Sequence, residues 1–95
     1  MATQLTLSIV SPERTLYEGV VSYLYVPGGA GYMGILKDHA PIISSLKPGQ
    51  FEVRPAKQGA SPIKFTTQKI GFMEVSQNLV SILLDATDSD VIPAA

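Results

Sequence analysis

A strand-like run leads directly into a glycine-rich loop at residues 22–41, which read SYLYVPGGAGYMGILKDHAP. The run at residues 21–26 is rich in β-branched and aromatic side chains, which favour extended backbone. The Pro-Gly-Gly sequence at residues 27–29 then breaks the chain sharply. We therefore predict a strand that ends where the loop begins.

The loop also contains the spacing Gly-x-Gly-x-x-Gly, which is the fingerprint of dinucleotide-binding loops; its glycines are Gly29, Gly31 and Gly34. In such loops the last glycine opens a helix, and the N-terminus of that helix holds the pyrophosphate. Only six residues separate Gly34 from Pro41, which leaves no room for a regular helix, and no βαβ pattern follows. We interpret the glycines as turn and close-approach positions between strands, and no cofactor is predicted.

Alternation of apolar and polar residues continues through most of the chain. Leu5, Leu7 and Ile9 show it first, and similar runs lie at residues 15–19, 50–54, 63–68, 72–75 and 79–85. Eight glycines and seven prolines are spread between the runs, as in an all-β sandwich or barrel. Residues 35–46 also fit a helical stripe, but Pro41 would lie in mid-helix. Two short strands are predicted there, with a single helical turn from Pro41 as the alternative.

Composition excludes several classes of protein. With 95 residues the chain is expected to form one domain. Its seven basic residues are scattered and the net charge is −1, so the clustered positive face of a nucleic-acid-binding protein is not expected. The absence of cysteine excludes a disulfide scaffold, a zinc knuckle and a thiol nucleophile. Neither a secretory signal nor a membrane-spanning stretch is expected.

No catalytic or metal-binding constellation is predicted. His39 is the single histidine, and no nucleophile or orienting acid accompanies it in a known pattern. Asp85, Asp88 and Asp90 lack the spacing of a calcium loop. Residues 88–90 resemble a helix start, but Pro93 follows at once. We therefore expect a protein that is not an enzyme.

Three segments taken together resemble the N-terminal domain of the epsilon subunit of F-type ATP synthases: SPERTLYEG at residues 11–19, VPGGAGYMGILKDHAPIISSLKPG at 26–49 and GFMEVSQNLVSILLDAT at 71–87. The shared features are Gly31-x-x-Gly34-Ile35, His39-Ala40-Pro41, Lys47-Pro48-Gly49 and Gly71-Phe72-x-Glu74-Val75 followed by Asn78. The resemblance implies an all-β fold, a two-sheet β-sandwich of about ten short strands at residues 1–87, with residues 88–95 as a C-terminal tail.

The resemblance also implies a function. It indicates a non-catalytic central-stalk subunit of the rotor, which packs on the gamma subunit and stands on the membrane rotor ring. Such a subunit couples proton flow to ATP synthesis and needs no cofactor or nucleic acid. It is a peripheral membrane protein on the cytoplasmic face of a bacterial inner membrane, or on the equivalent organelle face. Many family members continue into two C-terminal helices, which we do not find in these 95 residues, so no nucleotide binding is expected.

Site residues follow from the resemblance by position. The ring-facing loop is expected to include Gly31, Tyr32, Met33 and His39, and the gamma-facing residues are expected to include Ser11, Ile43 and Gln50. Gly31 and Gly34 would shape a tight loop or short hairpin at the membrane-facing end of the sandwich, with Tyr32 at its exposed tip and His39 nearby in the adjoining turn. The family often carries an acid at the position of Tyr32, so this contact is expected to use apolar area and one hydrogen bond.

An alternative function is a free-standing β-sandwich module that binds a carbohydrate or a peptide. Four tyrosines would supply the aromatic platform that such a module needs: Tyr17, Tyr23, Tyr25 and Tyr32. Three of them fall within predicted strands. Co-purification of the gamma subunit would distinguish a stalk subunit from such a module.

Overall fold

The computed structural model describes residues 4–87 and 91–93, and all regular structure in these residues is β-strand. The strands are β1 (Leu5–Val10), β2 (Thr15–Gly28), β3 (Gly31–Leu36), β4 (Ile42–Leu46), β5 (Gly49–Pro55), β6 (Ile63–Thr67), β7 (Gly71–Ser76), β8 (Leu79–Leu84) and β9 (Val91–Pro93). No helix in this part of the chain is long and apolar enough to cross a membrane. The predicted all-β class is confirmed.

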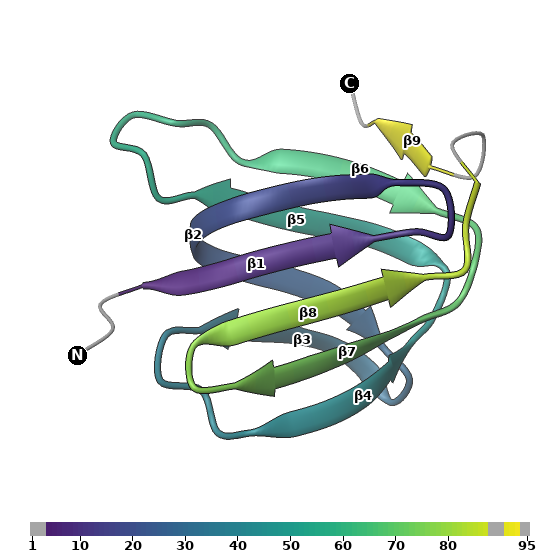
Figure 1. Ribbon diagram of the computed structural model, residues 1–95, viewed down its shortest axis with the longest axis horizontal. Helices are drawn as coiled ribbons and strands as arrows, with labels where there is room; N and C mark the ends of the chain where they lie inside the picture. Colours follow the sequence, from purple (N-terminus) through teal and green to yellow (C-terminus); the bar gives the residue numbers. More distant parts are fainter. Residues whose placement is uncertain (1–3, 88–90, 94–95) are drawn as a thin grey trace.

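The strands form two layers that β2 joins (Figure 1). The first layer has the order β1-β8-β7-β4, in which β1 and β8 are parallel and the other pairs antiparallel. The second layer has the order β3-β2-β5-β6-β9, and all its pairs are antiparallel. The first half of β2 pairs with β1 and its second half with β3 and β5, so one strand passes from layer to layer.

The core lies between the layers and follows the predicted alternation. Every second residue of β1, β7 and β8 is buried, as the sequence pattern requires for strands with one solvated face. Burial of each such aliphatic or aromatic side chain stabilises the fold by roughly 1.5–3 kcal/mol. The buried apolar residues are Leu5, Leu7, Ile9, Val21, Leu24, Val26, Ile35, Leu46, Phe51, Val53, Met73, Val75, Val80, Ile82, Leu84 and Ala86.

Strand β2 departs from the predicted pattern. The sequence predicts two strands at residues 15–19 and 21–26, but the structure has one continuous strand. Val21 pairs with Pro55 and Tyr23 with Arg54, so Ser22 is an extra residue on β2, as in a β-bulge. Because of this irregularity Val21 and Leu24 are both buried, although strict alternation would place them on opposite faces.

The glycine-rich loop is a β-hairpin turn. Gly28 pairs with Gly31, so Gly29 and Ala30 form the turn between β2 and β3. Gly31 has a φ of 139°, which residues with a side chain rarely adopt. Gly34 lies within β3 opposite Tyr25, so both glycines belong to a short hairpin, as predicted, but only Gly31 adjoins its turn.

Residues 35–46 contribute to two strands, β3 and β4, as predicted, and the alternative of a helical turn from Pro41 is wrong. Within the expected C-terminal tail, β9 pairs with β6. Phe65 lies opposite Pro93, and Thr67 lies opposite Val91. Residues 88–90, which carry the helix-start signal, lie outside the described residues.

Candidate interaction surfaces

The outer face of the first layer carries exposed apolar side chains on three adjacent strands. Ile43 in β4 is 76% exposed, Phe72 in β7 56% and Leu83 in β8 59%. Phe72 lies directly opposite Leu83 in the register, and all three side chains line one shallow surface depression. Leu79, further along β8, is 57% exposed. We call Ile43, Phe72, Leu79 and Leu83 the apolar face.

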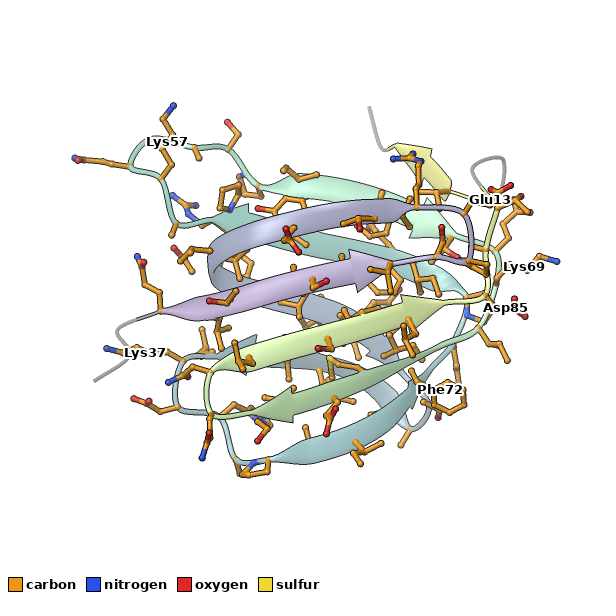
Figure 2. All side chains as sticks on the ribbon, in the orientation of Figure 1. Glu13, Lys37, Lys57, Lys69, Phe72 and Asp85 are labelled. Carbon is orange, nitrogen blue, oxygen red and sulfur yellow. The ribbon has the colours of Figure 1, made fainter. Side chains whose placement is uncertain are left out.

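The apolar face is not needed for the core. Its β7 and β8 residues alternate with Met73, Ile82 and Leu84, which fill the core from these two strands. A solvated face of an antiparallel sheet normally carries polar residues, and here Glu74 and Ser81 line the same depression as Ile43, Phe72 and Leu83. Exposed apolar side chains gathered in this way mark a candidate contact with another molecule. In Figure 2 Phe72 projects at one end of the first layer, near the β8 end marked by Asp85.

The second layer carries a tyrosine pair on its outer face, beside the β2–β3 hairpin. The rings of Tyr25 and Tyr32 stack with centroids 5.2 Å apart and an interplanar angle of 19°. The backbone N–H of Gln50 donates a hydrogen bond of 3.1 Å to the Tyr32 hydroxyl oxygen. A Cβ atom at Gly49 would lie 2.9 Å from that same oxygen. Tyr32 therefore lies across the start of β5, and we call Tyr25, Tyr32, Gly49 and Gln50 the tyrosine cluster.

A third tyrosine on this layer binds a carboxylate. The Tyr23 hydroxyl donates a short hydrogen bond to Glu52 Oε2, and Glu52 Oε1 lies 3.9 Å from the Lys64 ammonium. The hydrogen bond to Glu52, with partial desolvation, raises the pKa of Tyr23 above its ordinary value of 10.0. The Tyr23 phenol stays neutral, and Glu52 is already paired with Lys64. The Tyr23–Glu52 hydrogen bond therefore stabilises the sheet rather than forming a reactive centre.

The predicted ring-facing residues do not all lie together. Gly31, Tyr32 and Met33 begin β3 beside the hairpin turn. His39 lies beyond the other end of β3, where its backbone N–H donates to Leu36 O at 3.2 Å. Each residue of a strand advances the chain by about 3.3 Å, so the strand separates His39 from the hairpin. The expectation that His39 lies near Tyr32 is wrong.

The predicted gamma-facing residues are dispersed as well. Ser11 lies in the β1–β2 turn, where the backbone N–H of Arg14 donates to its hydroxyl oxygen at 3.3 Å. Ile43 belongs to the apolar face of the first layer, whereas Gln50 belongs to the tyrosine cluster of the second. The structure therefore brings Gln50, a predicted gamma-facing residue, into contact with Tyr32, a predicted ring-facing residue.

Sequence reasoning missed several surface residues. Phe72, Leu79 and Leu83 occupy the outward phase of β7 and β8, where polar residues are expected. Two adjacent apolar residues in a strand, such as Leu83 and Leu84, could have revealed this face. Adjacent strand residues point to opposite faces, so one of the two must point outward. Across residues 4–87 and 91–93 no three histidine, aspartate or glutamate side chains lie close enough together to hold a metal ion.

The family model and the most similar relatives found by comparison point to the same family. Residues 4–89 match the family model described as ATP synthase, delta/epsilon chain, β-sandwich domain. The chain is 43% identical over 84 residues to the ATP synthase epsilon chain of Leptospira borgpetersenii serovar Hardjo-bovis (strain JB197), covering 88% of this chain and 63% of the relative. It is 40% identical over 87 residues to that of Parvibaculum lavamentivorans, covering 92% of this chain and 64% of the relative.

Solved structures share the fold. A chain of the Euglena gracilis mitochondrial ATP synthase (OSCP/F1/c-ring, rotational state 1) matches with a TM-score of 0.82 at 21% identity, covering 98% of this chain and 55% of that chain. A chain of the Tetrahymena thermophila mitochondrial ATP synthase (central stalk/c-ring) matches with a TM-score of 0.71 at 16% identity, covering 88% and 65%.

This protein spans less than two thirds of the length of the relatives that match it. The family model nevertheless covers most of the sequence, and the two-layer sandwich agrees with its description. The chain belongs to the ATP synthase delta/epsilon family, of which it contains the β-sandwich domain.

Proposed function

We propose that this protein is the non-catalytic central-stalk subunit of a proton-translocating F-type ATP synthase. In this role the sandwich links the gamma subunit to the membrane rotor ring and so couples proton flow to ATP synthesis. The subunit is then a peripheral membrane protein on the cytoplasmic face of a bacterial inner membrane, or on the equivalent organelle face. Support comes from relatives named ATP synthase epsilon chain and from fold matches within ATP synthase complexes.

The apolar face is the structural observation that most directly supports a place for this chain within a complex. Ile43, Phe72 and Leu83 lie exposed on neighbouring strands of an otherwise well-packed sandwich. Burying such a face against another subunit contributes about 25 cal/mol for each Å² of apolar surface removed from water. A subunit that remains within a complex has this face covered. We assign the gamma subunit to it, and Ile43 lies on β4, the last strand of this layer.

The ring contact is assigned to the β2–β3 hairpin. Gly31, Tyr32 and Met33 lie there, at the end of the sandwich where β4 also finishes, since Gly28 pairs with Leu46. His39 follows the opposite end of β3, so we remove it from the ring contact. Gln50 moves into the hairpin contact because its N–H binds Tyr32, and Ser11 stays a proposed gamma-facing residue.

A rigid link suits this function. The antiparallel and parallel pairings of β1, β8, β7 and β4 form a continuous ladder from one edge of the first layer to the other. Such a closely packed body moves as a unit and passes force between the surfaces it presents, because packed interiors are not readily compressed. The subunit carries torque in this account and performs no chemistry of its own.

The test is co-purification with the gamma subunit. An affinity-tagged chain expressed together with gamma and the ring subunit should retain gamma through purification. The proposal fails if the folded chain, checked by circular dichroism, retains neither partner.

The alternative of a carbohydrate- or peptide-binding module has one structural observation in its favour. Three of the four tyrosines, Tyr23, Tyr25 and Tyr32, lie on the second layer, and two of them stack. Membership of the ATP synthase family weighs against a free-standing module. Binding of glycans by the isolated chain, without affinity for gamma, would favour the module.

A further inference from the structure

We propose that β9 is a detachable strand, and that the place it occupies on the second layer also accepts residues 91–93 of a second copy of this chain. That place has two parts, the edge of β6 that β9 borders and an apolar pocket that Val91 lines. We call the β6 edge and this pocket the β9 site. The inference is independent of the proposed function, because it concerns how copies of the chain recognise one another.

The first part of the β9 site is a strand edge. Strand β6 pairs with β5 on one side and with β9 on the other (Figure 1). Without β9, the backbone N–H and C=O groups on that side of β6 would be unpaired, and an unpaired edge is a template for pairing with another chain. The observed register shows that this edge accepts an antiparallel strand, with Thr67 opposite Val91 and Phe65 opposite Pro93.

The second part of the β9 site is the pocket beside that edge. Its wall includes Ile9 and Val53, which belong to the buried core, and the partly buried Leu16 and Phe65. Val91 is also partly buried and packs against the same core cluster. One side chain of β9 therefore covers an opening that reaches the core. A strand edge beside a pocket binds extended segments, since main-chain hydrogen bonds give affinity and the pocket selects the side chain.

Strand β9 is weakly attached to the sandwich. It has three residues, and Pro93 has no N–H, so at most two of its residues can donate a backbone hydrogen bond to β6. In the part of the chain that the structure describes, β9 pairs with no strand other than β6. Elements with so few contacts open locally at a free energy well below that of global unfolding. The β9 site is therefore empty for part of the time in the folded chain.

The occupant is identified by the strand that already lies in the site. When β9 detaches in two copies, each site can receive β9 of the other copy, with the same backbone pairing and the same contact of Val91 as within one chain. Such an exchange of an identical element is a low-cost route to a dimer. The high local concentration within one chain favours its own β9, so the exchanged state becomes more populated as protein concentration rises.

The test traps the exchange between two different variants of the full chain. The acceptor carries Thr66→Cys and the donor carries Ile92→Cys, because these two positions lie opposite each other in the β6–β9 pair and the chain has no other cysteine. The mixed chains are treated with a short bismaleimide, and the rate at which the 66–92 crosslinked dimer forms is measured by mass spectrometry. The control acceptor carries Leu36→Cys, at an exposed position of β3 on the other edge of the second layer.

We expect the 66–92 dimer to form faster than the control dimer, at a rate that rises with protein concentration. Adding Val91→Asp to the donor should lower this rate about tenfold, because a carboxylate does not enter an apolar pocket. Adding Val91→Asp to the acceptor should instead raise the rate about tenfold, because it displaces the acceptor's own β9 and empties the site. Val20→Asp is the matched control, since Val20 is 46% exposed on β2, and it should change neither rate.

A dimer that forms no faster than the control, or an effect of Val91→Asp that has the same sign in donor and acceptor, would overturn the inference. Thermal melting checks the folding of each chain, and if Val91→Asp does not fold, Val91→Ala should shift both rates in the same directions by about twofold. Hydrogen exchange tests the detachment separately. Amides of β9 that exchange as slowly as those of β5 would overturn the inference as well, because β9 would then leave only when the whole chain unfolds.

Discussion

Asp38 and Asn78 bind each other through two hydrogen bonds that connect two turns of the sandwich. The Asp38 backbone N–H donates to Asn78 Oδ1 at 2.6 Å, and Asn78 Nδ2 donates to Asp38 Oδ1 at 3.1 Å. Both residues have left-handed backbone, with φ of 63° and 64°. The Asn78 carbonyl also accepts the Thr6 N–H at 2.9 Å. The β3–β4 turn, the β7–β8 turn and the start of β1 are thereby held together.

This pair predicts a stability loss for Asn78→Ala. The variant loses both side-chain hydrogen bonds and places alanine in a left-handed conformation, so the free energy of unfolding should fall by about 1–3 kcal/mol. Asn78→Gly keeps the conformation accessible and should cost less. Urea denaturation measures both variants. Equal stability of Asn78→Ala and wild type would show that the pair contributes nothing.

The glycines should differ in their tolerance of alanine. A Cβ at Gly71 would lie 2.6 Å from Leu83 O and 2.7 Å from Leu84 Cδ2, so Gly71→Ala should lower the free energy of unfolding by about 1–3 kcal/mol through overpacking. A Cβ at Gly34 would meet Tyr25 Cδ1 at an ordinary 3.7 Å. Gly34→Ala should therefore change stability by less than about 0.5 kcal/mol, and a larger cost at Gly34 than at Gly71 would contradict this packing.

Tyr23 should make stability depend on alkaline pH. Its hydrogen bond to Glu52 raises the pKa of the phenol in the folded state, so its stabilising effect is fully present below the unfolded pKa of about 10. The effect is lost as pH rises through the folded pKa. Tyr23→Phe should melt at a lower temperature than wild type at pH 7, and the difference should shrink above pH 10. A difference that is constant from pH 7 to 11 would rule out this origin.

The apolar face should tolerate a charge in the isolated chain and not in the complex. Ile43 is 76% exposed, so Ile43→Asp should fold normally yet bind gamma about tenfold more weakly, because it places a charge in an apolar contact. Leu36→Asp is the matched control, because Leu36 is a similarly exposed aliphatic residue on the second layer. Surface plasmon resonance against gamma compares them. Equal losses for both variants would remove the apolar face from the proposed contact.

Much of the fold could be predicted from local patterns. The alternation of Leu5, Leu7 and Ile9, and that of Met73 and Val75, identifies buried faces because adjacent strand residues point in opposite directions. Pro41 ruled out a helix at residues 35–46 for a local steric reason. The irregularity at Ser22 was not predictable, since it appears only when β2 is paired with β5, some thirty residues away.

The candidate site was harder to predict because it depends on register between distant strands. Tyr32 and Gln50 meet across β2, and Tyr25 joins them through the pairing of β2 with β3. No local sequence pattern predicts these contacts between residues of different strands. The misplacement of His39 has the same cause: the sequence shows a short separation from Tyr32, whereas the extended strand between them carries His39 away from the hairpin.

In the proposed function, the sandwich connects gamma to the ring through two separate surfaces. The chain has no cysteine, so a single cysteine introduced at position 32 or at position 43 reports one location without background. The decisive measurement is the identity of the subunit crosslinked to each cysteine in the assembled enzyme. We predict that position 32 crosslinks to the ring subunit and position 43 to gamma. Crosslinking of position 32 to gamma or the catalytic head alone, with none to the ring, would contradict the account.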